Sequence, residues 1–547
     1  MRFLSRLGIF VSLFLTLSFA QQQGGTAVIA LIQEPGLLNS FFGSQSAVDL
    51  AGALTQEPLF IADATGTYQP LLAEEIPTVE NDGISEDYLT VTYKLREGLV
   101  WSDGTPFTAD DIVFTFEVYK NPESTPAGAA VVAAYEAVES VTKIDERTVE
   151  VKMNGVNPGY LELWQAVLPA HMFDSSAVTD QHPQARIPLG TGPFIITEWL
   201  EGDSITFERN PNYREEGKPY LDSVVVRIIP EKEVAISSLL TGDVDTVFFI
   251  TAGDLQSLSE AQENGQGVTV ILQDTKSWVE WLWLNNADPN DASQPHPVLG
   301  DPAIREAMDL AIDRQSIVDE ILGGFGSLTG SFIYSGFAAV DKPATTFDPE
   351  AAKAVLENAG WIAGQDGIRE KDGVRASLRF TTIAGDQVRE LYQQLIQQNL
   401  KDVGLEIIID NQPANLIFAG WGDDGLYVRG QYDIMMSRAG YAIDPASWAS
   451  EFSTAQIPSD DNQAGSNAVR YANAEFDTLV ADAAVIADPE ERKALYARAV
   501  ERFAQDRPAL PLYSSAWGWV WRDTLQGVDT NWWNGMWPSV ANWYIEQ

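Results

Sequence analysis

Two hydrophobic patterns alternate along the chain. Short apolar or alternating runs at 27–32, 148–153 and 224–229 predict β-strands, because successive side chains of a strand point to opposite faces. Apolar residues recur every three or four positions after residue 301 and from 388 to 403, which predicts amphipathic helices. The two patterns interleave without an obvious repeat, so we expect mixed α/β domains.

Several of the predicted helices begin at a residue that can cap them. Residues 108–111 read Thr-Ala-Asp-Asp, which has the form of a capping box. Asp301, Asp348 and Asp488 each stand directly before a proline, and proline is favoured at the first helical position. We therefore expect a helix to start at each of these four places.

The first twenty residues differ from the rest of the chain. Arg2 and Arg6 precede the apolar run 7–17, and residues 18–20 (Ser-Phe-Ala) match the small-x-small pattern of a cleavage site. The run is shorter than a membrane-spanning helix needs. Residues 1–20 are therefore predicted to be a cleaved signal peptide of an exported protein, with an uncleaved anchor as the alternative.

The chain is strongly acidic and lacks cysteine. Its 547 residues include 78 Asp and Glu but 34 Lys and Arg, which gives a formal charge of −44. A field of this sign repels phosphate backbones and excludes nucleic acid as a partner. Without cysteine there are no disulfides, no thiol catalysis, no thiolate metal sites and no lipid anchor on an N-terminal cysteine.

Motifs for catalysis are missing from the sequence. The histidines, His171, His182 and His296, are far apart and lack the spacing of metal ligands. His182 and His296 each precede a proline in a polar stretch, so we expect both on the surface. The sequence has neither a G-x-S-x-G elbow nor a phosphate-binding loop. We predict no catalytic residue, no cofactor and no metal site.

Tryptophan is unusually frequent, with 16 in the chain. Three fall within 278–283, three alternate at 517–521 on one face of a predicted strand, and four more lie within 532–543. Indole rings stack well on sugar rings and on peptide side chains. The alternative is that most of them pack in the core or between lobes.

A series of segments resembles the family 5 extracytoplasmic solute-binding proteins of ABC importers, the group of dipeptide-, oligopeptide- and nickel-binding receptors. Residues 95–112 (LREGLVWSDGTPFTADDI) match the signature region of that family almost residue for residue. The other matching segments, in the order of the family, are 190–194, 210–213, 239–245, 311–314, 347–353, 359–361, 488–492 and 508–513. Together they extend over nearly the whole mature chain.

The resemblance implies an α/β fold of the two-lobed periplasmic-binding-protein (Venus-flytrap) type, with an extra α/β domain inserted in the first lobe. We expect the inserted domain at 57–187 and lobe II at 276–511. Lobe I is expected to combine the segments 25–56, 188–275 and 512–547. The ligand would then bind between the lobes.

The resemblance also points to candidate binding residues. In oligopeptide-binding members an Asp near the end of lobe II holds the α-ammonium group of the ligand, and Asp444 stands at the matching offset from Arg438. Pro445 follows at once, however, so Asp444 is equally consistent with a helix N-cap. Glu34 falls in a segment that lines the cleft of the family, although 39–40 read Asn-Ser where many members have Asp-Pro. The candidate walls of the site are Tyr441, Trp448, Trp421 and Trp283, and Arg438 and Trp281 are further candidates for ligand binding.

The sequence thus predicts a monomeric periplasmic receptor without a lipid anchor. It would capture a short peptide between its lobes and deliver this small-molecule ligand to an ABC permease in the inner membrane. One alternative is the same receptor class binding an oligosaccharide, which the tryptophan excess would suit. A remote alternative is a secreted glycoside hydrolase that uses two carboxylates.

Overall fold

The computed structural model describes residues 23–546, apart from 44–45, 125–134, 249, 251, 441–442, 464, 487, 532 and 534–535. The predicted signal peptide and the candidate wall residue Tyr441 lie outside the described residues.

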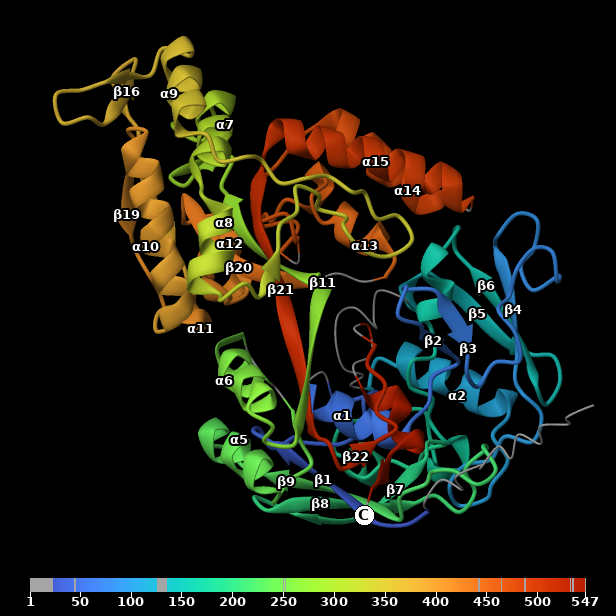
Figure 1. Ribbon diagram of the computed structural model, residues 1–547. Coiled ribbons are helices and arrows are strands. Elements are labelled where there is room, and N and C mark those ends of the chain that lie inside the picture. The colour runs from blue at the N-terminus through green and yellow to red at the C-terminus, as the bar shows by residue number, and fades with distance from the viewer. Residues whose placement is uncertain are drawn as a thin grey trace, which may run out of the picture.

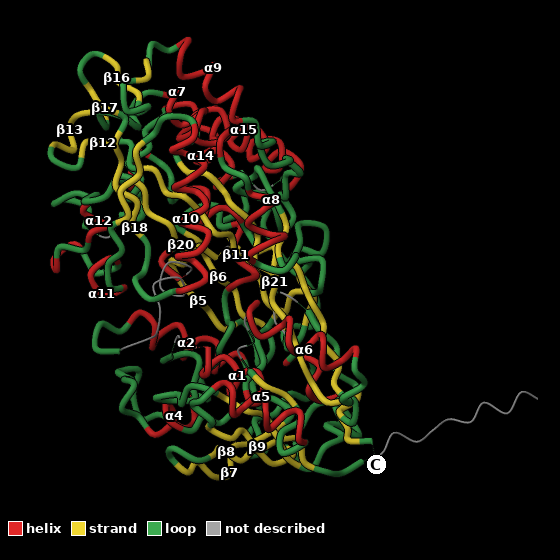
Figure 2. Tube along the Cα trace, turned by 60° about the vertical axis from the view of Figure 1, so that its left-hand side comes forward, coloured by secondary structure: helices red, strands yellow, loops and turns green. Residues whose placement is uncertain are grey.

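One sheet extends through both lobes (Figures 1 and 2). Within the described residues its strands follow the order β19-β18-β20-β11-β21-β10-β1-β9-β8-β7, and β14 also pairs with β21. The long antiparallel strands β11 (Val268–Leu284) and β21 (Ala509–Arg522) connect the lobes, and their register shifts between 274 and 279. The other strands are β1 (Thr26–Leu31), β7 (Phe194–Leu200), β8 (Ser204–Arg209), β9 (Ser223–Ile228), β10 (Thr246–Val247), β14 (Gly326–Ser327), β18 (Ser377–Thr381), β19 (Glu406–Ile409) and β20 (Ile434–Gly440).

Lobe I, at the bottom of Figure 1, surrounds the β1 and β7–β10 end of this sheet. The C-terminal segment, drawn in red, returns to this lobe. Apolar residues of β1, β8, β9 and β21 form its core together with the first helix and the C-terminal tryptophans. Its other elements are α1 (Ser46–Thr55), α5 (Lys232–Thr241), α6 (Ala252–Glu263), β22 (Leu525–Gln526), η6 (Trp537–Asn542) and β23 (Tyr544–Ile545).

A separate small domain stands beside the long strands, at the right of Figure 1. Its sheet has the order β4-β6-β5 and shares a core with α2. The predicted capping box is confirmed, because Thr108 and Asp111 cap α2 reciprocally. The elements of this inserted domain are β2 (Phe60–Ala62), β3 (Tyr68–Pro70), β4 (Thr90–Lys94), α2 (Ala109–Lys120), β5 (Val138–Lys143), β6 (Thr148–Met153), η1 (Pro158–Glu162), η2 (Ala170–Met172) and α4 (Pro183–Arg186).

Lobe II is the more helical part, at the top of Figure 1. Alternate residues of β11 enter two different cores, with Leu282 in one and Trp281 and Trp283 in the other. Its helices are α7 (Pro302–Ala311), α8 (Arg314–Ser316), η3 (Ile317–Ile321), α9 (Pro349–Asn358), α10 (Gln387–Asp402), α11 (Ala414–Ile417), η4 (Trp421–Asp423), α12 (Leu426–Arg429), α13 (Pro445–Ser450), η5 (Thr454–Gln456), α14 (Ala474–Val485) and α15 (Pro489–Asp506). Its small sheets contain β12 (Ala287–Asp288), β13 (Asp291–Pro295), β15 (Ile362–Ala363), β16 (Arg369–Lys371) and β17 (Val374–Arg375).

The helix starts predicted in lobe II are confirmed. Asp301, Asp348 and Asp488 each accept a hydrogen bond from a backbone N–H in the first turn of α7, α9 and α15, respectively. Among the described residues, no helix is both long and apolar enough to cross a membrane.

Candidate ligand-binding site

The strands β11 and β20 hold one exposed tryptophan at the junction of the lobes. Trp278 pairs with Gly440 in the register of these strands, and 43% of Trp278 is exposed. A Cβ atom at position 440 would lie 3.0 Å from the Trp278 ring. The absence of a side chain at Gly440 therefore leaves the space that the Trp278 ring occupies.

A cavity of about 690 Å³, which we call the lobe I cavity, opens beside this ring. Trp517 and Trp519 of β21 line it with their ring centroids 6.3 Å apart, and Trp537 lies 6.2 Å from Trp519 at a right angle. Trp278 and Trp533 complete the aromatic lining. Indole faces of this kind accept aliphatic chains, planar groups and cations.

One arginine and one lysine of the lobe I cavity are each paired with a nearby carboxylate. Arg214 Nη2 lies 3.0 Å from Glu57 Oε1, and Lys218 Nζ lies 2.8 Å from Glu215 Oε2. Glu57 is buried; burial raises the pKa of its carboxyl, and the neighbouring Arg214 opposes that rise. Asp49 of α1 lines the same cavity, and within the described part of the chain its carboxylate has no ion-pair or hydrogen-bond partner.

A pocket of about 300 Å³, which we call the lobe II pocket, lies against β20 in lobe II. Ala439, the residue before the junction glycine, lines it together with Trp283 and Trp448. The Trp283 indole donates to Ser437 Oγ at 2.9 Å, which fixes the ring against β20. The two tryptophan rings meet edge to face with their centroids 6.4 Å apart.

The lobe II pocket also contains an acid without a partner. Across the described residues, the Glu451 carboxylate makes no hydrogen bond or ion pair, and burial raises its pKa to about 7. Arg438 lines the same pocket, but its Nε lies 3.7 Å from Oε2 of the buried Glu280. Glu280 is already paired with Arg389 at 2.7 Å, so Arg438 shares this carboxylate at a longer distance.

A third cavity, of about 590 Å³, lies between the inserted domain and lobe II, and we call it the interdomain cavity. Glu162 lines it from the inserted domain and accepts a hydrogen bond from the Tyr68 hydroxyl at 3.2 Å. Asp444 and Arg492 line it from lobe II. Burial raises the pKa of Glu162 to about 7, and the nearby charge of Asp444 adds to the rise.

Asp444 is engaged within lobe II. Its Oδ1 accepts the backbone N–H of Ala446 at 2.9 Å, at the start of α13. The same carboxylate forms a bidentate ion pair with Arg492, at 2.9 and 2.7 Å. The N-cap interpretation of Asp444 therefore has a hydrogen bond that supports it, and Arg492 already supplies the cation.

The structure brings three of the predicted site residues together and separates the others. Trp283, Trp448 and Arg438 all line the lobe II pocket. Trp281 is 0% exposed and stacks on Trp283 at 5.3 Å in the core of lobe II, to which Trp283 and Trp448 also belong. Trp281 lines a different cavity, which lies within lobe II. Trp421 is half-buried under the Arg429 guanidinium.

Glu34 makes its contacts within lobe I. Its Oε1 accepts the Trp199 indole N–H at 3.2 Å and the Gly202 N–H at 2.9 Å. These bonds tie the loop after β1 to the turn between β7 and β8. Both hydrogen bonds of Glu34 therefore stabilise lobe I. Glu34 does not line the lobe I cavity, the lobe II pocket or the interdomain cavity.

Several residues of these cavities were missed as site candidates. The alternation at 517–521 indicates an aromatic strand face, and this pattern was sufficient to identify Trp517 and Trp519 as candidate ligand-binding residues. Asp49 and Glu451 carry no local signal, because the rings around each come from distant parts of the chain.

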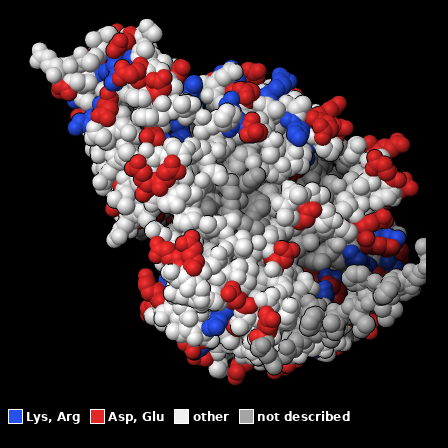
Figure 3. All heavy atoms as spheres, in the orientation of Figure 1, with Lys and Arg blue, Asp and Glu red and all other residues white. Residues whose placement is uncertain are grey.

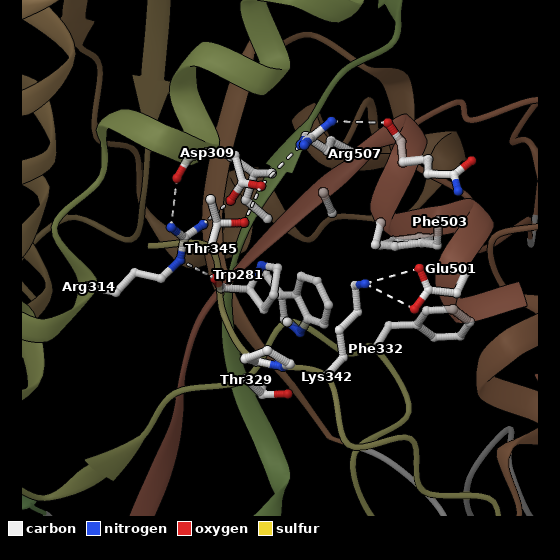
Figure 4. A pocket seen from close by; sticks show the side chains of 17 residues that line it. Trp281, Asp309, Arg314, Thr329, Phe332, Lys342, Thr345, Glu501, Phe503 and Arg507 are labelled. Carbon is white, nitrogen blue, oxygen red and sulfur yellow. Dashed lines mark hydrogen bonds and ion pairs between the residues drawn. The ribbon is translucent and has the colours of Figure 1, made fainter. Parts of the chain in front are cut away.

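A further cavity, of about 330 Å³, lies wholly within lobe II (Figure 4). Its charged groups point toward one another: Asp309 contacts both Arg314 and Arg507, and Lys342 contacts Glu501. All of its lining residues fall between 281 and 511, so a ligand here would touch one lobe only. We assign these ion pairs a structural role.

The histidines have structural partners. His171 Nε2 lies 2.9 Å from Asp103 Oδ2. His296 is 4% exposed, which corrects the expected surface position: its ring faces Asp433 and accepts the backbone N–H of Val298. No group of three or more His, Asp or Glu side chains suited to a metal ion occurs among the residues described.

Known proteins are similar in sequence to this chain. The family model for bacterial extracellular solute-binding proteins, family 5 (middle part), matches residues 67–459. The oligopeptide-binding protein AppA of Bacillus subtilis is 28% identical over 517 residues, which cover 90% of this chain and 86% of AppA. A probable ABC transporter-binding protein of Deinococcus radiodurans is 25% identical over 549 residues, which cover 92% of this chain and 89% of that protein.

Solved structures share the fold. The structure of Bacillus subtilis AppA in complex with a nonapeptide has a TM-score of 0.71 at 25% identity, covering 96% of this chain and 100% of AppA. The ABC transporter substrate-binding protein CtaP of Listeria monocytogenes has a TM-score of 0.80 at 22% identity, covering 96% of this chain and 100% of CtaP. The predicted two-lobed α/β fold is confirmed. This chain belongs to the bacterial extracellular solute-binding proteins, family 5.

Proposed function

We propose that this protein is the receptor of an ABC importer and that it binds a short peptide between its lobes. The observation that carries the proposal is that cavities open in both lobes against the strands that connect them: the lobe I cavity reaches Trp278 of β11, and the lobe II pocket reaches Ala439 of β20. The relationship to AppA, an oligopeptide-binding protein solved with a nonapeptide, favours a peptide as the ligand.

Such a receptor needs no nucleophile. A ligand that contacts both lobes does so fully only in the closed form, and binding therefore shifts the equilibrium toward closure. A near-complete switch requires the ligand to favour the closed form by about 5 kcal/mol. The aromatic walls would supply apolar contact, while strand edges would bind the peptide backbone. We therefore propose a binding protein and not an enzyme.

In this proposal Asp444 caps α13 and pairs with Arg492, and it does not hold the ligand's amino group. Its two oxygens already accept three hydrogen bonds from lobe II. Trp283, Trp448 and Arg438 remain ligand-binding candidates in the lobe II pocket. Trp278 joins them from the lobe I cavity.

The proposal includes the organisation predicted from sequence. Lobe I comprises 25–56, 188–275 and 512–547, the inserted domain 57–187 and lobe II 276–511. The exported protein works as a monomer in the periplasm after removal of residues 1–20, and the closed form docks on a membrane permease.

Native mass spectrometry of the purified protein, followed by denaturation and identification of what is released, tests the ligand class. A ladder of short peptide masses supports the proposal. Masses spaced by a hexose would contradict it and favour an oligosaccharide. If the protein is empty, a pool of random pentapeptides should quench its tryptophan emission, and the absence of any response at millimolar peptide would also contradict the proposal.

A further inference from the structure

We propose that the site selects ligands with positively charged groups. The carboxylates of Asp49 in the lobe I cavity and Glu451 in the lobe II pocket would bind these groups. The chemical class is a cationic peptide, with lysine or arginine side chains held against indole rings. This inference rests on the proposed function and specifies its substrate class.

The charges of the lobe I cavity leave one acid unbalanced. Three acids and two bases line this cavity. Arg214 and Lys218 are paired with Glu57 and Glu215, so Asp49 is the carboxylate that remains. A cationic ligand group would balance it.

Asp49 is available to such a group. It is exposed to solvent, yet the surrounding protein reduces its hydration and raises its pKa. A carboxylate that has lost part of its hydration without gaining a partner interacts more strongly with an incoming cation.

The lobe II pocket repeats this arrangement. Glu451 is partly buried among the aromatic side chains of the pocket, and no partner for its carboxylate occurs in the described chain. The arginine of the same pocket, Arg438, lies 3.7 Å from Glu280, a carboxylate that it shares with Arg389. Trp448 supplies a ring toward which an ammonium or guanidinium group is attracted by the π-electrons, whereas Trp283 is stacked against Trp281 and Phe452.

The two cavities lie against the same pair of strands. Trp278 lines the lobe I cavity, and Ala439, which lines the lobe II pocket, is the neighbour of the glycine that pairs with Trp278. Because neighbouring residues of a strand point to opposite faces, each cavity would hold its own cationic group. The long-range field acts in the same direction, because the chain carries a formal charge of −44 and acidic side chains outnumber basic ones over the face in Figure 3.

The test uses three pentapeptides, Ala-Lys-Ala-Lys-Ala and its norleucine and glutamate counterparts, titrated by calorimetry at low and high salt. The variants are Asp49→Asn, Glu451→Gln and the double variant. Glu216→Gln is the matched control, since Glu216 is exposed and lies outside the lining of the lobe I cavity. Melting curves verify that each variant folds.

We expect the wild type to bind the lysine peptide about tenfold more tightly than the norleucine peptide, and the glutamate peptide least tightly. Each single variant should reduce the lysine preference, and the double variant should abolish it. The affinity for the norleucine peptide and the behaviour of Glu216→Gln should stay unchanged. A lysine peptide that binds no better than norleucine, or a preference that persists in the double variant, overturns the inference and leaves the peptide receptor standing.

A second probe separates this inference from the proposed function. N-acetyl-lysine amide and N-acetyl-norleucine amide are titrated at millimolar concentration, with tryptophan emission as the readout. If no pentapeptide binds but the lysine amide binds in an Asp49- and Glu451-dependent manner, the peptide proposal fails and the cation selectivity stands. If neither probe shows a preference for the cation, the selectivity is overturned as well.

Discussion

Asp444 and Arg492 form a bidentate ion pair, with Oδ2 2.9 Å from Nη1 and Oδ1 2.7 Å from Nη2. The pair connects the start of α13 to the first turn of α15, and both side chains are largely buried. Geometry of this kind fixes two helices of lobe II relative to each other. The ion pair also engages the carboxylate that the sequence analysis proposed as the binding partner of a ligand's ammonium group.

Asp444→Asn should therefore destabilise the protein without changing how it recognises an amino group. Asparagine caps a helix as well as aspartate does, but the substitution leaves a buried Arg492 without its anion, at a loss of about 3 kcal/mol in the free energy of unfolding. Urea unfolding measures this loss. Asp348→Asn is the matched control, since Asp348 caps α9 through Ala351, and this change should be nearly neutral.

The Asp444→Asn variant also tests whether Asp444 binds the amino group of a peptide ligand. Calorimetry compares Ala-Lys-Ala-Lys-Ala with a free and with an acetylated amino end. Asp444→Asn should change both affinities by the same factor. If the variant weakens only the peptide with the free amine, Asp444 is the ammonium anchor and the proposed role is wrong.

Contact between the inserted domain and lobe II should weaken as pH rises. Glu162 accepts a hydrogen bond from Tyr68 of its own domain and faces Asp444 of lobe II across the interdomain cavity, and its pKa there is about 7 against an ordinary value of 4.5. The contact state therefore binds more protons between these values, so the contact is most favourable below pH 4.5 and loses up to about 3 kcal/mol by pH 7. Above pH 7 this contribution stays constant.

Fluorescence energy transfer measures this effect, because the chain has no cysteine of its own and dyes can be attached at Glu86→Cys and Lys493→Cys. The ligand-free protein should be more closed at pH 5.5 than at pH 8, and Glu162→Gln should remove that difference. Glu80→Gln is the control, because Glu80 is an exposed acid of the same cavity whose pKa is lowered. An undiminished pH response in Glu162→Gln would exclude Glu162 as its source.

Local sequence was sufficient for the helix starts, because capping depends on residues two or three apart. Asp301, Asp348 and Asp488 were identified this way, and the structure confirms each one. The buried state of His296 was missed, because its partner Asp433 is 137 residues away. A polar stretch before a proline does not show that a distant carboxylate covers it.

The site depended on long-range packing and was predicted less well. Trp281 and Trp283 share one face of β11 with Val279, as the alternation of a strand requires, and this face enters the core of lobe II. The sequence shows the alternation but not which helices cover the face. Asp49 is more than 400 residues from the β21 tryptophans beside it, so only the fold reveals that acid–aromatic cavity.

Glu451→Gln should stabilise the protein at alkaline pH. Burial raises the pKa of Glu451 to about 7 from an ordinary 4.5, so the charged carboxylate opposes folding above pH 7 by about 3 kcal/mol at most. This penalty is absent below pH 4.5 and grows as pH rises through the window between the two values. The difference in unfolding free energy between variant and wild type should follow that course in urea titrations at pH 4.5, 6 and 8. A variant less stable than the wild type at pH 8 would show that the carboxylate has a stabilising partner in the folded protein.

Gly440→Ala should weaken ligand binding by displacing Trp278. The new Cβ would lie 3.0 Å from the Trp278 ring, and because 43% of Trp278 is exposed, the ring can turn away and the protein still folds. The ring then no longer lines the lobe I cavity, so the dissociation constant for Ala-Lys-Ala-Lys-Ala should rise about fivefold. Trp278→Ala should raise the dissociation constant by a similar factor, and the double variant should add nothing further, since both changes remove the same contact.

Gly36→Ala is the control, because a Cβ at Gly36 meets nothing within 4 Å. Additive effects of Gly440→Ala and Trp278→Ala in this double-mutant cycle would mean that the glycine acts on the ligand by a route other than the tryptophan.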